Sequence, residues 1–236
     1  MKLVPVLFLV ASCAAISAPG QVVDSTGSVA GAVRFDGERP EARWIEIPEA
    51  HRAHAGAERV RDESWVVAKD RGVANCVVTL KPLGDTPKAE AKVPDEPVRF
   101  AHVGPRFEPH TLAVPAGTTV AFANVDSDCA CFHSYARRNP NLNATVARGA
   151  QRELVFDRAE VVRVSNDLLP WMEGYVVVVD EPFFAVTGAD GAFRFDGLAP
   201  GCYRLEVWHE EGGELRETVE VVAGDSARVD LAITKR

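Results

Sequence analysis

The stretch Phe184-Ala-Val-Thr-Gly-Ala-Asp-Gly-Ala-Phe-Arg-Phe-Asp-Gly-Leu-Ala-Pro-Gly-Cys-Tyr-Arg-Leu-Glu-Val-Trp208 decides the fold of the C-terminal part of the chain. Its apolar residues alternate with polar ones, and two pairs of turn residues, Asp190-Gly191 and Pro200-Gly201, interrupt the alternation. Alternation places one face of a strand in a core, and an Asp-Gly pair favours a tight hairpin. The pattern therefore predicts three strands joined by two turns, the first of them a hairpin. Residues 215–222 and 227–234 are predicted to add two more strands.

This C-terminal pattern resembles the second half of a carboxypeptidase-regulatory-like domain, which is a transthyretin-type β-sandwich. The segments that resemble the first half lie far upstream, in Gly27-Ser-Val-Ala-Gly-Ala-Val-Arg-Phe35 and in Ala74-Asn-Cys-Val-Val-Thr-Leu80. The resemblance therefore implies one sandwich in two parts, residues 24–96 and 182–236, which are separated by an insertion over residues 97–181.

The insertion has a pattern of its own, Phe107-Glu-Pro-His-Thr-Leu-Ala-Val-Pro-Ala-Gly-Thr-Thr-Val-Ala-Phe-Ala-Asn-Val-Asp126. A strand, a Pro/Gly turn, a second strand and an Asn-x-Asp corner in this order resemble a cupredoxin. The two modules together resemble bacterial exported proteins of the plastocyanin-like or methylamine-utilisation-like kind. The resemblance implies an all-β chain in which a Greek-key cupredoxin-like sandwich is inserted in a transthyretin/carboxypeptidase-regulatory-like β-sandwich.

The resemblance also implies positions for a copper site. A blue-copper site needs two imidazoles, one thiolate and a weak axial thioether. Counted from the corner Asn124, the first imidazole position is Ala130. Aligned on Pro170-Trp171-Met172, the thiolate position is Asn166 and the second imidazole position is Leu169, so only the thioether Met172 is present. Alanine, asparagine and leucine cannot hold Cu(II) in that geometry. We therefore expect no cofactor and a pocket that is repacked as hydrophobic core.

Three neighbouring residues, Cys129, Cys131 and His133, offer a different set of ligands. On an extended strand the period is two, so all three point to one face, opposite to residue 130. Two thiolates and an imidazole suit zinc or Cu(I). Together with Met172 they are the candidate metal ligands, and copper or zinc is the alternative to an absent cofactor. A disulfide and a surface histidine are the ordinary interpretation of the same three residues.

The N-terminus predicts export, because residues 3–11 form an apolar run that is followed by small residues. Cleavage after Ala18-Pro19-Gly20 would make residues 1–20 a signal peptide. Alternatively, Val10-Ala11-Ser12-Cys13 resembles a lipobox, which would make residues 1–12 a lipoprotein signal and place a lipid anchor on Cys13. The run is shorter than the ~20 residues of a transmembrane span. We expect a periplasmic or extracellular protein, tethered to a membrane if Cys13 is lipidated.

Charge and cysteine content indicate which partners and which covalent links to expect. The formal net charge of −8 excludes nucleic acid as an expected partner, because phosphate would be repelled. The cysteines left after export, Cys76, Cys129, Cys131 and Cys202, favour disulfides in an oxidising compartment.

Residues 48–58 could form a short helix. The carboxylates Glu210, Glu211 and Glu214 are predicted to lie in a solvated loop.

No phosphate loop, nucleophile elbow or other catalytic run is found, so we expect no enzyme. The favoured function is an exported, non-catalytic binding or structural protein with an unidentified protein or cell-surface partner. One alternative is a copper-binding electron-transfer protein that uses the altered ligand set. The other is a carbohydrate- or cell-surface-binding module.

Overall fold

The computed structural model describes residues 25–126 and 129–235, which form nineteen strands and one short helix. The predicted all-β class is confirmed. The predicted signal peptide and the Cys13 lipobox lie outside the described residues. In the described part of the chain, no helix is long and apolar enough to cross a membrane.

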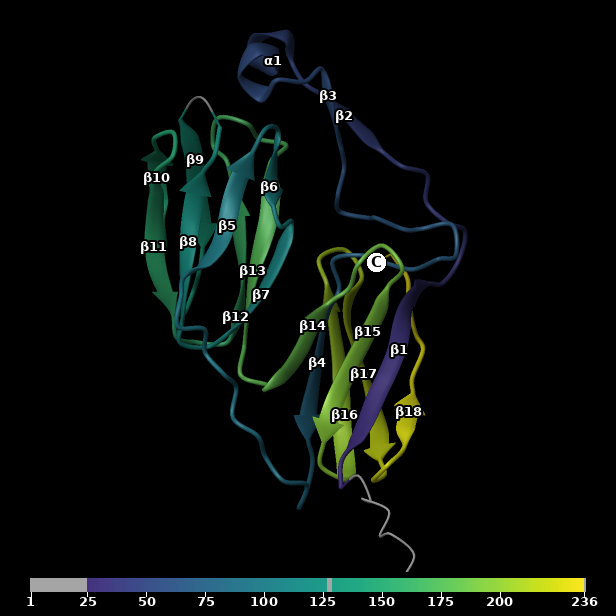
Figure 1. Cartoon of the computed structure of the whole chain (residues 1–236). Helices are drawn as coiled ribbons and strands as arrows, with labels where there is room; N and C mark the ends of the chain where they lie inside the picture. The colour runs from purple at the N-terminus through teal and green to yellow at the C-terminus, as the bar shows by residue number, and fades with distance from the viewer. Residues whose placement is uncertain (1–24, 127–128, 236) are drawn as a thin grey trace, which may run out of the picture.

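The strands form two pairs of sheets, which we call the outer and the inserted sandwich (Figure 1). The outer sandwich consists of β1 (Gly27–Phe35), β4 (Val77–Pro82), β14 (Phe183–Val186), β15 (Ala192–Leu198), β16 (Gly201–His209), β17 (Gly213–Val221), β18 (Ser226–Arg228) and β19 (Leu231–Ile233). One sheet has the order β15-β1-β18, with β19 also paired to β1, and the other has the order β14-β4-β16-β17. The inward faces bury one apolar core that includes Val33, Leu80, Phe195 and Tyr203.

Two details of the C-terminal prediction are wrong. Strand β14 pairs with β4 and strand β15 pairs with β1, so the turn at Asp190-Gly191 carries the chain between sheets and does not form a hairpin. Gly191 has a φ of +69°, and an added Cβ would lie 2.2 Å from the carbonyl oxygen of Val33, so the position requires glycine. The predicted strand over residues 227–234 is divided into β18 and β19, because Asp230 leaves the ladder and its side chain accepts a hydrogen bond from the Ala32 amide.

The inserted sandwich is formed by the strands that follow β4 and precede β14. They are β5 (Val98–Val103), β6 (Arg106–Glu108), β7 (Thr111–Pro115), β8 (Thr118–Asn124), β9 (Ala130–Tyr135), β10 (Asn143–Val146), β11 (Gln151–Phe156), β12 (Glu160–Ser165) and β13 (Glu173–Val179). Their sheets have the orders β10-β9-β12-β13-β7 and β11-β8-β5-β6. Aromatic side chains fill the space between the sheets, among them Phe100, Phe107, Phe122 and Phe132.

A third element lies at the end of the inserted sandwich that carries the β12–β13 connection (Figure 1). It comprises strand β2 (Trp44–Glu46), helix α1 (Glu49–Ala55) and strand β3 (Arg59–Arg61), and we call it the cap. The short helix expected within residues 48–58 is therefore present. The cap buries Ile47, Ala55 and Val60 in a small cluster against Trp171.

The two sandwiches contact each other through an apolar cluster. Val77 of the outer sandwich packs there against Val177 and Val179 of the inserted one, with Tyr175 and Trp208 at its margin. The ring centroids of Tyr175 and Trp208 are 5.3 Å apart in an edge-to-face arrangement. This contact fixes β16 of the outer sandwich against β13 of the inserted sandwich, and it positions the polar groups described below.

Candidate functional site

The four positions of the expected copper site lie together in the interior of the inserted sandwich. Asn166, Leu169 and Met172 come from the β12–β13 connection, which we call the closing loop. Each of the three is at most 2% exposed, and Ala130 at the start of β9 is fully buried. Ala130, Leu169 and Met172 belong to the same apolar core cluster. The leucine therefore fills space in the core, as an apolar side chain does.

Hydrogen bonds close the loop without any other group. The Asn166 Oδ1 atom accepts hydrogen bonds from the Leu168 and Leu169 amides at 2.9 and 3.0 Å. The Asn166 amide donates to the Met172 carbonyl at 3.2 Å, and the Met172 amide donates to the Leu169 carbonyl at 2.8 Å. The Asn166 side-chain nitrogen lies 3.8 Å from the Met172 sulfur. The polar atoms of the loop are thus largely paired within the loop.

These residues do not fit a type-1 copper ion. Ala130 and Leu169 carry no donor atom, and the carbonyl oxygen of Asn166 is already used by two backbone amides. A thioether supplies only a long, weak axial contact, so Met172 alone cannot hold the metal. The pocket is therefore a packed apolar core that contains one hydrogen-bonded side-chain amide, that of Asn166.

The candidate ligands of the alternative set are divided between two faces of β9. Ala130 and Phe132 point into the core that contains Met172, whereas Cys131 and His133 alternate with them and point to the outer face. Cys129 precedes the strand and is exposed. The structure thus places Met172 away from the other three. Among the described residues, no group of three or more His, Cys, Asp or Glu side chains has the arrangement of a metal site.

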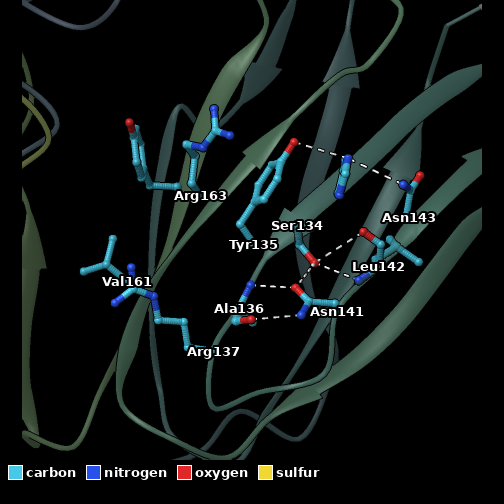
Figure 2. A pocket seen from close by; sticks show the side chains of 11 residues that line it. Ser134, Tyr135, Ala136, Arg137, Asn141, Leu142, Asn143, Val161 and Arg163 are labelled. Carbon is cyan, nitrogen blue, oxygen red and sulfur yellow. Dashed lines mark hydrogen bonds between the residues drawn. The ribbon is translucent and has the colours of Figure 1, made fainter.

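The outer face of β9 lines a shallow pocket with a volume of about 710 Å³ (Figure 2). The His133 ring stacks on the Tyr135 ring with centroids 4.3 Å apart, and the Arg163 guanidinium lies 4.2 Å from the Tyr135 centroid. The His133 Nδ1 atom is 3.0 Å from the Asp167 carboxylate. Because this nitrogen already has a carboxylate partner, the histidine is part of a surface network whether or not a metal binds.

The four cysteines that sequence reasoning assigned to disulfides are all free in the described part of the chain. They lie in different places: Cys76 in the core of the outer sandwich, Cys129 just before β9, Cys131 on β9, and Cys202 exposed on β16. The expected disulfides are therefore not formed. Burial raises the pKa of the Cys76 thiol to about 12, which keeps it protonated.

A cluster of buried polar side chains lies between the sandwiches, and the sequence did not predict it. His110, between β6 and β7, forms an ion pair through Nε2 with Glu210 in the β16–β17 turn, and each side chain is only 8% exposed. The His110 Nδ1 atom is 4.0 Å from the carboxylate of Glu63. The Tyr175 hydroxyl donates to the Glu173 carboxylate at 2.8 Å nearby. The prediction of a solvated acidic loop is wrong for Glu210, because docking of the two sandwiches buries it.

The pKa values in this group are shifted by burial and by neighbouring charge. Burial lowers the pKa of His110, but the hydrogen bond to Glu210 and the charges of Glu210, Glu63 and Glu173 outweigh it, so the pKa is raised. Burial raises the pKa of the Glu63 carboxyl, and it also raises the pKa of the Tyr175 hydroxyl. No spacing in the sequence signals this group, because its members come from four separate segments.

Comparison with known proteins gives limited results. No family model matches the chain, and a search of curated proteins returns no match. Among solved structures, the chain is similar to the copper-containing nitrite reductase NirK from Thermus scotoductus SA-01, with 24% identity and a TM-score of 0.35 over 44% of this chain. The matched region spans only 26% of that reductase chain.

Two smaller solved proteins are matched over nearly their whole length. A reduced amicyanin variant is 23% identical with a TM-score of 0.33, covering 43% of this chain and 99% of that one. A purple cupredoxin from Nitrosopumilus maritimus is 24% identical with a TM-score of 0.30, covering 35% of this chain and 99% of that one. At these identities and TM-scores, the similarity assigns no activity to this chain.

Proposed function

We propose that the protein is an exported, non-catalytic binding or structural module whose inserted sandwich keeps a cupredoxin-like frame without type-1 copper. The hydrogen bonding of Asn166 carries the proposal. At the position where a thiolate is needed, the chain has an amide whose oxygen accepts from the Leu168 and Leu169 amides. The thiolate would be the strongest bond to copper, and no side chain of the closing loop supplies a substitute.

Burial supports the same proposal. Leu169 occupies an imidazole position at 1% exposure, in contact with the apolar core. A cation placed there would lose its hydration and gain no strong ligand, which costs far more free energy than packing a leucine. The export part of the proposal rests on the apolar run at residues 3–11 and on the small residues that follow it.

Metal loading tests the proposal. The mature chain is purified under reducing conditions, loaded separately with copper and with zinc, desalted, and analysed for bound metal per chain. We expect less than stoichiometric metal of either kind. Stoichiometric metal that is lost in the double variant Cys129→Ser/Cys131→Ser would instead support the alternative function, metal binding through Cys129, Cys131, His133 and Met172. A Cys202→Ser variant is the matched control, since Cys202 is an exposed thiol on the other sandwich.

The carbohydrate-binding alternative is less well supported by the surface geometry. Sugar recognition on a sheet face uses an open aromatic ring. Tyr135 is 40% exposed, but the His133 ring and the Arg163 guanidinium both stack on it. Part of the ring face is therefore already covered.

A further inference from the structure

A cleft of about 300 Å³ opens where the cap, the closing loop and the β16–β17 turn meet. Both sandwiches and the cap contribute to its walls, so it exists only in the docked arrangement of the chain. Sites for small molecules are often found between domains, in clefts with an apolar wall and a few convergent polar groups. This cleft has both features.

One wall of the cleft is apolar. It is formed by Ile45 and Val60 of the cap and by Pro170 and Trp171 of the closing loop. The indole nitrogen of Trp171 donates a hydrogen bond to the Pro105 carbonyl at 3.2 Å, which fixes the ring. This wall can cover the apolar body of a small ligand.

Carboxylates also line the cleft, and Glu63 is the one that lies near His110 without a hydrogen bond to it. Its side chain is three-quarters buried, with 25% exposed. Its one ionic contact is the 4.0 Å approach to the His110 Nδ1 atom, which is too long for a hydrogen bond. Among the residues that the structure describes, no donor forms a hydrogen bond to this carboxylate. Burial raises the pKa of Glu63 and outweighs the charges of His110, Arg106 and Arg61, which lower it, so a further cation at this point would stabilise the carboxylate.

The charges around the cleft lead to the same conclusion. Five carboxylates line it, and they face three guanidiniums and the His110 imidazole. Two of the guanidiniums are used, because Arg43 pairs with Asp62 at 3.4 Å and Arg106 pairs with Glu108. The third, Arg61, lowers the pKa of Glu63 by its charge, but within the described residues it forms no ion pair with it. The carboxylates that have no guanidinium partner among the described residues are Glu63, Glu210 and Glu211. His110 lies between the first two and cannot neutralise both.

We propose that this cleft binds a small organic cation, a protonated amine whose ammonium group meets Glu63 and whose apolar body lies against Trp171 and Val60. An ammonium group donates charge-assisted hydrogen bonds to a carboxylate, and these are the strong ones. A neutral ligand of the same shape would leave Glu63 without a donor. An anion would be repelled by Glu210 and Glu211.

Calorimetric titration of the full chain tests the proposal, with benzylammonium as the probe and with benzyl alcohol and benzoate as neutral and anionic comparators of similar shape. Benzylammonium is expected to bind, and both comparators are expected to bind much more weakly. The variant Glu63→Gln should weaken benzylammonium binding by about 10-fold or more, as loss of a charge-assisted hydrogen bond implies. Glu217→Gln removes the same charge at an exposed position on β17 and should leave binding unchanged.

The proposal is overturned if the wild-type chain does not bind benzylammonium at millimolar concentration, if benzyl alcohol binds equally well, or if Glu63→Gln binds as tightly as wild type. A measurement on the wild-type chain alone guards against a variant that fails to fold. The NMR signal of the Trp171 indole N–H should shift during titration with benzylammonium and stay in place with benzoate. A signal that does not respond to benzylammonium overturns the proposal as well.

Discussion

The ion pair between His110 and Glu210 makes a strong prediction, because it joins the two sandwiches in a buried setting. Each side chain is 8% exposed, and the two come from different sandwiches. The variant His110→Ala leaves Glu210 buried without its cation. Breaking a buried pair from one side costs about 3–5 kcal/mol, and we expect the lower end, ~3 kcal/mol, because Tyr175 lies close enough to Glu210 to offer its hydroxyl. That corresponds to a change on the order of 100-fold in the unfolding equilibrium.

A double-mutant cycle separates the pair from other effects of the substitution. Glu210→Gln and the double variant complete the cycle. We expect the double variant to cost less than the sum of the single variants by about 1–3 kcal/mol, because the second change removes the charge that the first left unpaired. The same substitution at His133, which is 28% exposed and paired with the half-exposed Asp167, is the control and should cost about 0–1 kcal/mol.

The pH dependence has a definite sign. The pKa of His110 is raised above its ordinary 6.5 in the folded protein. Its contribution to stability is therefore complete below pH 6.5 and is lost as the pH rises through the raised value. Urea unfolding followed by tryptophan fluorescence, below pH 6.5 and well above it, measures both effects. A His110→Ala variant within ~0.5 kcal/mol of wild type at the lower pH, together with an additive cycle, would refute the reasoning.

Three further predictions concern single buried groups. Leu169→Ala should destabilise the protein by about 2–5 kcal/mol through the cavity it leaves, whereas Leu168→Ala, at a position that is 57% exposed, should change the urea midpoint little. Burial, with a smaller effect from the charge of His110, lowers the pKa of His209 from 6.5 to about 4. The contribution of the neutral His209 to stability is therefore complete above pH 6.5. Up to ~3 kcal/mol of it is lost as the pH falls through 4. A His209→Asn variant should show a smaller loss between those pH values, and an equal loss would contradict the assignment. Finally, iodoacetamide should modify the exposed Cys202 rapidly and Cys76 only after unfolding, and mass spectrometry of the native chain checks this.

Local signals in the sequence were sufficient for several of the strands. The segment at residues 27–35, which resembles the start of a regulatory-like domain, coincides with strand β1. The pairing of strands was harder. The Asp190-Gly191 turn was identified, but a turn signal does not say whether its two strands pair with each other. Here they pair with β4 and β1, which lie far away in the sequence. The pairing follows from the packing of two sheets, and that is a tertiary property.

Some features of the candidate site were also predictable from the sequence, and others were not. The period of two along β9 predicted that Cys131 and His133 face away from Ala130, and the burial of the strand agrees with this. Alignment on the closing loop placed Leu169 in the interior, where it lies. The group around His110 could not be predicted, because its hydrogen-bond partner Glu210 is 100 residues away and belongs to the other sandwich. A charged residue in a turn looks solvated until another part of the chain covers it.

The closing loop is held in place by its own side chains and backbone. In a metal site the ion fixes the relative positions of its loop ligands. Here the Asn166 side chain does so by accepting from two backbone amides, and the Asn166 and Met172 backbones complete the turn. Leu169 adds apolar burial at the same point. Side-chain hydrogen bonds and core packing thus position the loop. It remains available to support the cap through Trp171.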